Sequence, residues 1–468
     1  MGKNKELVKN TAILSLGRFS TQLISFILMP LFTYFLSTSD YGYIDLIQTY
    51  IALVAPIIIF RLDAGLFRFL IDNRRKSKDQ EIIISNVLLF SFVQVLFFAF
   101  IFLIVAFLIN INLALPIVIN AVSFIFSNLM LQIARGIGDN KKYSIASILA
   151  GVATLVVSIV LVCVAGIGGA GVLLGSASGN ILCFIYLLIV LQTRRKIKRS
   201  NINKGYLKRI LKYSIPMVPD GLSWWVLGVS DRTIISLLIG TAANGVYAVS
   251  SKFSNILSSI FQVFNMSWQE SASLHINDKD RDEFFSGVLN TTYKLFYTIC
   301  LLILGVMPFI FIVLIDQSYH DAYIYAPILL CGNLVNAIAN ITGAVYIAKK
   351  KTKIAARTTI VAAVINIVVN LLLVNQFGLY AAAISTLVAY SFLAVFRYFD
   401  IKKYVNMRLN VKLFIISILV YIICSIVYWQ QNIIFSVVNL LVIVVFCLLL
   451  NRSLIRGGIN LLLHKKKK

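Results

Sequence analysis

The chain has 468 residues, of which 59% are hydrophobic and 13% are charged, and its formal net charge is +25. This composition excludes an ordinary soluble domain, in which about a quarter of the residues are charged. The positive charge is spread over short connections. It therefore predicts a membrane topology and attraction to anionic lipids, and we expect no nucleic-acid partner.

Strongly apolar runs follow one another along the whole sequence. Each is long enough, or nearly so, for the roughly 20 residues that a membrane-spanning helix needs. In chain order, the expected helices cover residues 19–36, 43–60, 82–109, 113–134, 143–167, 170–192, 213–239, 245–266, 295–315, 324–348, 354–374, 379–396, 411–429 and 433–450. The sequence therefore predicts an all-α integral membrane protein with 14 transmembrane helices.

The basic residues are confined to alternate connections. Of the 43 Lys and Arg residues, 37 lie in the segments 1–10, 72–81, 135–142, 193–212, 270–283, 349–357, 397–412 and 451–468. The other connections contain none; they lie near residues 37–42, 110–112, 167–170, 240–244, 316–323, 375–378 and 430–432. Because basic connections stay in the cytoplasm, we expect both termini to be cytoplasmic.

The basic segment 193–212 separates two halves that resemble each other. Aligning Gly42 with Gly245 matches the beginnings of two expected helices, and further along the chain Gly168 matches Gly378 at an offset of 210 residues. Six-helix repeats in the same orientation are a transporter architecture, with substrate handled between the lobes. We predict an N-terminal lobe of helices 1–6, a C-terminal lobe of helices 7–12, and helices 13–14 with a basic cytoplasmic tail, at residues 1–197, 198–405 and 406–468.

No motif for nucleotide binding, metal binding or hydrolysis is present in the sequence. The six cysteines all lie in apolar runs without C-x-x-C spacing, and the three histidines lie in connections or in the tail. The outer connections have about eight residues at most, too few for an external active site. We therefore expect no enzyme activity, no cofactor and no metal.

Six cations fall outside the basic connections. Ionisable groups inside a membrane are costly and usually face a cavity or a partner. We assign the binding of a phosphate-bearing substrate first to Arg232 and Lys252, which lie about 12 Å from the outer ends of neighbouring antiparallel helices. The weaker candidates are Arg18, Arg61 and Lys294. The alternative role for all of them is in ion pairs that hold the bundle together.

Carboxylates and prolines complete the candidate site. The carboxylates that could couple transport or pair with the cations are Asp63, Asp220 and Asp231. Prolines interrupt helical hydrogen bonding and are tolerated where protein or water satisfies the freed carbonyls. Helices 1 and 7 hold equivalent places in the two halves and both contain prolines, so we expect gating bends at Pro30, Pro216 and Pro219.

Short segments along nearly the whole chain resemble the polysaccharide-transporter flippases (Wzx-type) of the multidrug/oligosaccharidyl-lipid/polysaccharide superfamily. They are Lys9-Asn10-Thr11, Asp40-Tyr41-Gly42, Leu66-Phe67-Arg68-Phe69, Asp231-Arg232-Thr233-Ile234-Ile235, Gly245-Val246-Tyr247 with Lys252, Tyr323-Ile324-Tyr325-Ala326-Pro327, Lys349-Lys350-Lys351-Thr352, and Asn366 and Asn370 followed by Gly378. The sequence departs from the family pattern at Ser267-Trp268-Gln269-Glu270, where relatives often have Pro after the aromatic residue.

The resemblance implies a flippase of the bacterial cytoplasmic membrane that works by alternating access. Its substrate would be an undecaprenyl-pyrophosphate-linked oligosaccharide, moved from the inner to the outer leaflet for O-antigen, capsule or exopolysaccharide synthesis. A polysaccharide polymerase and chain-length machinery would be its partners. The alternatives are a peptidoglycan-precursor flippase or a multidrug exporter of the same superfamily and, from another class, a membrane-embedded polysaccharide polymerase.

Overall fold

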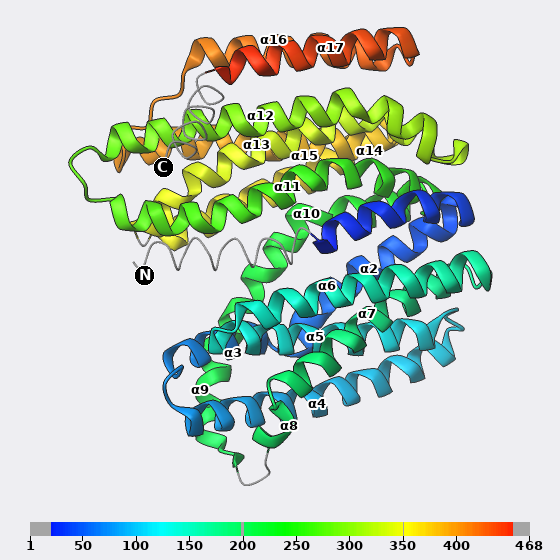
Figure 1. Ribbon diagram of the computed structural model, residues 1–468, viewed down its shortest axis with the longest axis vertical. Coiled ribbons are helices and arrows are strands. Elements are labelled where there is room, and N and C mark those ends of the chain that lie inside the picture. Colours follow the sequence, from blue (N-terminus) through cyan, green and yellow to red (C-terminus); the bar gives the residue numbers. More distant parts are fainter. Residues whose placement is uncertain (1–19, 198–200, 350, 453–468) are drawn as a thin grey trace, which may run out of the picture. The chain divides into compact units, whose positions relative to one another are not determined.

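The computed structural model describes residues 20–197, 201–349 and 351–452, and its regular elements there are all helices (Figure 1). Eleven of them are long and apolar enough to cross a membrane. These coincide with 11 of the predicted runs, and the remaining runs fall on the helix Ser20–Phe35, on α10 (Val218–Leu238) and on α11 (Thr241–His275). The chain is thus an all-helical, multi-pass membrane protein, which packs as two compact units, 1–245 and 246–468.

The described part of the first unit runs from the helix Ser20–Phe35 to the beginning of α11. Between them lie α2 (Thr38–Ile58), α3 (Leu62–Asp72), α4 (Ser77–Leu108), α5 (Ala114–Ile137), α6 (Asn140–Ser158), the π-helical η1 (Ile159–Val164), α7 (Gly169–Val190), α8 (Thr193–Lys196), α9 (Lys204–Ser214), the 3-10 segment η3 (Ile215–Met217) and α10. Figure 1 shows α4, α5, α6 and α7 running side by side, and α7 packs against both α5 and α6.

The helix predicted at 43–60 is followed by a break and by a second helix, α3. Pro56 lies in the last turn of α2, and the N–H of Arg61 donates to the carbonyl of Pro56 at 2.8 Å. Phe60 and Arg61 have left-handed backbone conformations, with φ of 49° and 55°. Such a conformation costs roughly 1–2 kcal/mol for a non-glycine residue. The span predicted at 43–60 is therefore interrupted shortly after Pro56, and Arg61 lies in the break.

The basic segment 193–212 packs within the first unit as α8, a short connection and α9. The Ser85 hydroxyl of α4 donates to the Lys196 carbonyl at 2.8 Å, and the N–H of Asn203 donates to Asn86 Oδ1 at 2.9 Å. Ile210 of α9 is fully buried, and α9 packs against α3 and α4. The outward side of α9 carries the exposed cations Lys204, Lys208, Arg209 and Lys212.

The second unit contains most of α11 and the helices that follow. These are α12 (Arg281–Leu314), the 3-10 segment η4 (Gln317–Tyr319), α13 (Ala322–Ala348), α14 (Thr352–Phe377), α15 (Leu379–Asp400), the 3-10 segment η5 (Ile401–Lys403), α16 (Val411–Trp429) and α17 (Ile433–Leu450). In Figure 1, α16 and α17 run alongside α12, and both pack against it.

Side chains of α16 satisfy backbone groups at the beginning of α13. Pro327 has no N–H, so the carbonyl of Tyr323, four residues earlier, lacks its helical donor. The Tyr428 hydroxyl of α16 donates to that carbonyl at 3.0 Å, and the Tyr323 hydroxyl donates to the Tyr428 carbonyl at 2.9 Å. The two rings stack with their centroids 3.9 Å apart. Buried hydrogen bonds therefore attach the C-terminal helix pair to the rest of the unit.

Arg397 is a buried cation of the second unit. The sequence assigns it to an inner connection, but α15 continues to Asp400 and leaves Arg397 only 3% exposed. Its guanidinium donates, over distances of 2.9 to 3.3 Å, to acceptors on α13 and α14, namely the carbonyls of Ala339 and Ala355 and the hydroxyls of Thr358 and Thr359. Hydrogen bonds from a charged donor are stronger than neutral ones, so Arg397 ties three helices together.

Candidate functional site between α2 and α10

Arg232 of α10 contacts two polar side chains of α2. Its Nε lies 3.2 Å from Asp45 Oδ2, and its Nη1 donates to Thr49 Oγ1 at 3.0 Å. Asp45 and Thr49 lie one turn apart and are 7% and 6% exposed, whereas the Arg232 side chain keeps 17% of its surface exposed. An isolated charge in a membrane span is costly, and a carboxylate at this distance offsets that cost. Arg232 is thus neutralised but still accessible.

Two aromatic side chains extend this contact. The Tyr50 hydroxyl donates to Thr233 Oγ1 at 3.2 Å, and Trp225 Nε1 donates to the Thr49 carbonyl at 3.2 Å. The Tyr50 and Trp225 rings stack with centroids 6.2 Å apart. Trp225 and Arg232 share one face of α10, because seven residues make about two helical turns. The site therefore combines a cation with aromatic surface.

A close approach of two glycines fixes α2 against the beginning of α11. A Cβ on Gly42 would lie 1.8 Å from the Thr241 carbonyl oxygen, and a Cβ on Gly245 would lie 2.1 Å from the Thr38 carbonyl oxygen. Only glycine permits this backbone contact. The alignment that matches Gly42 with Gly245 also matches Thr38 with Thr241, so the two contacts are equivalent in the predicted repeat.

Arg61 makes a separate contact with α10. Its Nε lies 3.8 Å from Asp63 Oδ1, and a Cβ on Gly221 of α10 would lie 3.3 Å from Arg61 Nη1. Gly221 and Arg232 are separated by 11 residues, about 16 Å along the helix axis. Arg61, between α2 and α3, therefore faces α10, and Arg232 of α10 faces α2. The two contacts lie at different positions along the axis of α10.

The other predicted cations belong to other parts of the chain. Lys252 is on α11 and Lys294 is on α12; both belong to the second unit and both are partly buried. Arg18 precedes the first described residue. A role for these three in substrate binding stays a prediction.

The predicted carboxylates and prolines take different positions. Asp231 is buried on α10 beside the paired arginine, and the side chain of Asp220 lies outside the described part of the structure. Pro30 lies within the helix Ser20–Phe35, which continues through it without interruption. Pro216 lies in the 3-10 segment η3 and Pro219 in the first turn of α10. Helical geometry thus changes at the predicted gate of helix 7, while gating itself stays a prediction.

Asp45 and Thr49 are not among the residues predicted from the sequence. A signal for them exists, because they are polar residues spaced i, i+4 in a mainly apolar run and so share one helix face. Their partner on α10 lies more than 180 residues away, and only the tertiary structure identifies it. Within the described residues, no group of three His, Cys, Asp or Glu side chains is arranged to hold a metal ion.

Comparison with solved structures identifies the fold. The lipid II flippase MurJ in an inward closed conformation aligns with a TM-score of 0.70 at 15% identity, covering 95% of this chain and 100% of that chain. An inward-facing multidrug resistance MATE family transporter of the MOP superfamily gives 0.67 at 13% identity, with 82% and 97% covered. A point mutant of the Vibrio cholerae MATE transporter VcmN gives 0.62 at 14% identity, with 85% and 96% covered. At these identities the likeness establishes the fold.

Sequence comparison identifies the family. Among curated proteins, none matches this chain significantly. The family described as "Polysaccharide biosynthesis protein" matches residues 7–268, more than half of the chain. This match covers residues 7–245 of the first unit, including Asp45, Thr49 and Arg232. The chain therefore belongs to the polysaccharide biosynthesis protein family and has the helical fold of MATE transporters and of MurJ.

Proposed function

We propose that the protein is a flippase for an undecaprenyl-pyrophosphate-linked oligosaccharide. It would carry the sugar headgroup from the inner to the outer leaflet of the bacterial cytoplasmic membrane by alternating access, in the synthesis of a surface polysaccharide. Membership of the polysaccharide biosynthesis family supports this pathway, and the fold shared with MATE transporters and MurJ supports translocation across a membrane.

The observation that carries the proposal is the contact of Arg232 with Asp45 and Thr49. A guanidinium donates to carboxylates and phosphates in the same geometry, so a diphosphate can replace Asp45 as its partner. Arg232 needs no new desolvation when the exchange occurs, because it already lies in a membrane span at 17% exposure. Trp225 and Tyr50 supply aromatic surface beside it for sugar rings. When the substrate leaves, Asp45 forms its ion pair with Arg232 again.

The proposal includes 14 transmembrane helices, two six-helix lobes in the same orientation and a C-terminal helix pair. The alternation of basic and cation-free connections supports the number of spans. The reciprocal contacts of Gly42 and Gly245 support the repeat, because equivalent residues meet each other at a two-fold axis. Bending near Pro216 and Pro219 would move α10, which carries Arg232, between the two states.

Labelling of single cysteines tests this topology. In a variant lacking the six native cysteines, we expect Ser39→Cys, Gln317→Cys and Gln431→Cys to react with a membrane-impermeant thiol reagent in intact cells. Ser77→Cys should react only after the membrane is opened. All four native side chains are exposed, so accessibility depends on the side of the membrane. Labelling of Ser77→Cys in intact cells would overturn the proposed orientation.

A second candidate substrate is the peptidoglycan precursor, because a lipid II flippase aligns with nearly the whole chain. A binding series with the purified protein separates the candidates. The series uses a polyprenyl-diphosphate-linked oligosaccharide, lipid II and an organic cation. We expect the first to raise the melting temperature most, through Arg232. Preference for lipid II would reassign the substrate, and stabilisation by the organic cation alone would favour a multidrug exporter. A membrane-embedded polymerase would instead extend the lipid-linked oligosaccharide.

A further inference from the structure

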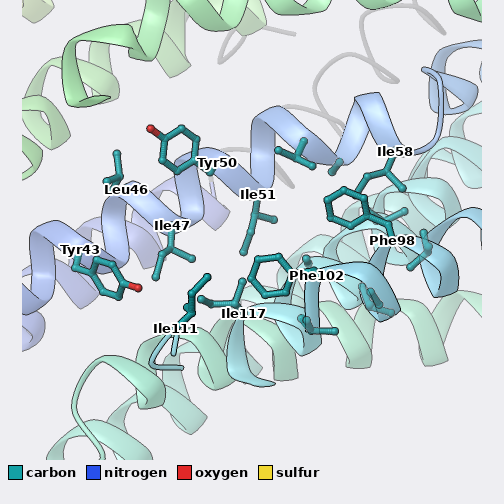
Figure 2. A pocket seen from close by; sticks show the side chains of 18 residues that line it. Tyr43, Leu46, Ile47, Tyr50, Ile51, Ile58, Phe98, Phe102, Ile111 and Ile117 are labelled. Carbon is teal, nitrogen blue, oxygen red and sulfur yellow. The ribbon is translucent and has the colours of Figure 1, made fainter. Parts of the chain in front are cut away.

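An apolar cavity of about 370 Å³ lies between α2, α4 and α5 (Figure 2). The residues of α2 that line it recur every three or four positions, from Tyr43 to Ile58, and so form one helical face. Ile47 on this face follows Asp45 by two residues, which places the two side chains about 160–200° apart around α2. One helix thus separates the cavity from the contact with Arg232.

The side chains that line the cavity are mostly apolar and suit a hydrocarbon ligand better than water molecules. Its floor consists of buried aliphatic side chains such as Ile51, Val95 and Ile125, and the side-chain hydroxyls of its lining are those of Tyr43 and Tyr50. In Figure 2, Phe98 and Phe102 of α4 lie across from α2. A water molecule needs two to four polar partners, and an apolar cavity of about 150 Å³ already stays dry and binds benzene. This cavity has room for about two to three groups of that size.

The cavity borders the membrane. Its α4 wall belongs to a candidate membrane span whose outward side carries the exposed rings of Phe97 and Phe100. The lining side chains of Phe98 and Phe102 are themselves partly exposed. A hydrocarbon chain can therefore reach the cavity from the side without crossing water.

Tyr50 belongs both to the cavity and to the ionic site. It is one of the residues that line the cavity, its ring stacks on Trp225, and its hydroxyl donates to Thr233, the neighbour of Arg232. A lipid with an anionic end at Arg232 can therefore contact both if its hydrocarbon chain is long enough to pass Tyr50 around α2.

We infer that the cavity binds the isoprene units of the transported lipid that follow its diphosphate. This inference rests on the proposed function and assigns a site for the chain of the same substrate. Two to three isoprene units fill the volume, and their methyl branches and double bonds suit the flat rings of Tyr43, Tyr50, Phe98 and Phe102. The rest of the chain stays in the bilayer.

The test compares two synthetic lipids that carry the same diphosphate-linked oligosaccharide, one with a single isoprene unit and one with four. We expect the purified wild-type protein to bind the longer lipid at least tenfold more tightly. Ala121→Phe fills the cavity from α5 and should reduce this ratio to less than threefold, and Ala99→Phe should do so from α4. Ala153→Phe is the control, because Ala153 is also partly buried but lies on α6 away from the cavity.

An unchanged ratio in both cavity variants would overturn the inference. So would a phospholipid that copurifies with the wild-type protein, is lost from Ala121→Phe, and is not displaced by the longer lipid. Failure of the proposed function has a different signature. In that case, Arg232→Ala would bind the single-isoprene lipid as tightly as the wild-type protein does, whatever the cavity variants do.

Discussion

Replacement of Arg232 by alanine is expected to abolish surface polysaccharide in cells that depend on this protein. The guanidinium is the cation that the diphosphate would contact inside the membrane, and it is held in place by Asp45 and Thr49. A hydrogen bond to a charged group contributes about 1.5–3 kcal/mol, or more than tenfold in affinity. The measurement is the polysaccharide level at equal amounts of membrane-inserted protein. Arg232→Lys should retain part of the activity, because it keeps the charge but loses the two-pronged geometry.

A control is needed because Arg232→Ala also leaves Asp45 buried without its cation, and breaking a partly buried pair destabilises a protein. The double variant Arg232→Ala, Asp45→Asn removes both charges. It should restore the amount of folded protein without restoring polysaccharide. Wild-type polymer levels from this double variant, or from a well-expressed Arg232→Ala, Lys252→Ala variant, would show that these cations do not bind substrate.

Asp45→Asn alone is expected to have the opposite effect on binding. With the carboxylate neutralised, Arg232 loses the anionic competitor that lies 3.2 Å away, so a diphosphate lipid should bind more than tenfold more tightly. Turnover should fall, because Asp45 no longer recovers Arg232 when the substrate is released. The measurement combines equilibrium binding with the rate of a single translocation. Asp40→Asn is the matched control, because Asp40 is an exposed carboxylate of the same helix. Unchanged or weaker binding by Asp45→Asn would refute the exchange of partners.

The membrane spans could be predicted from the sequence because their signal is local. A run of about 20 apolar residues defines a span without reference to any other part of the chain. The signal is weaker at α10 and α11, which carry Asp231, Arg232 and Lys252 and are not among the helices that length and composition identify as candidate spans. The polar residues that weaken the apolar signal of α10 thus include Arg232 of the candidate site.

Contacts between helices could not be predicted in the same way. The sequence selected Arg232 as a candidate cation and offered Asp63, Asp220 and Asp231 as carboxylates that could pair with the cations, but it did not select Asp45. The structure shows Asp45 on another helix as an ionic partner. Arg397 was assigned to a connection because a basic residue near the end of a span is usually cytoplasmic. Its acceptors on α13 and α14 allow it to be buried instead.

The central claim, that this protein moves a lipid-linked oligosaccharide through a step that requires Arg232, is tested most directly in proteoliposomes. A polyprenyl-diphosphate-linked oligosaccharide with a fluorophore on its sugar is incorporated into both leaflets, and a membrane-impermeant quencher is added outside. With the wild-type protein, we expect the fluorescence to fall until the inner-leaflet pool is also quenched. With Arg232→Ala, and in liposomes without protein, only the outer-leaflet pool should be quenched. Wild-type liposomes that behave like protein-free liposomes, or Arg232→Ala liposomes that behave like wild-type ones, would contradict the claim.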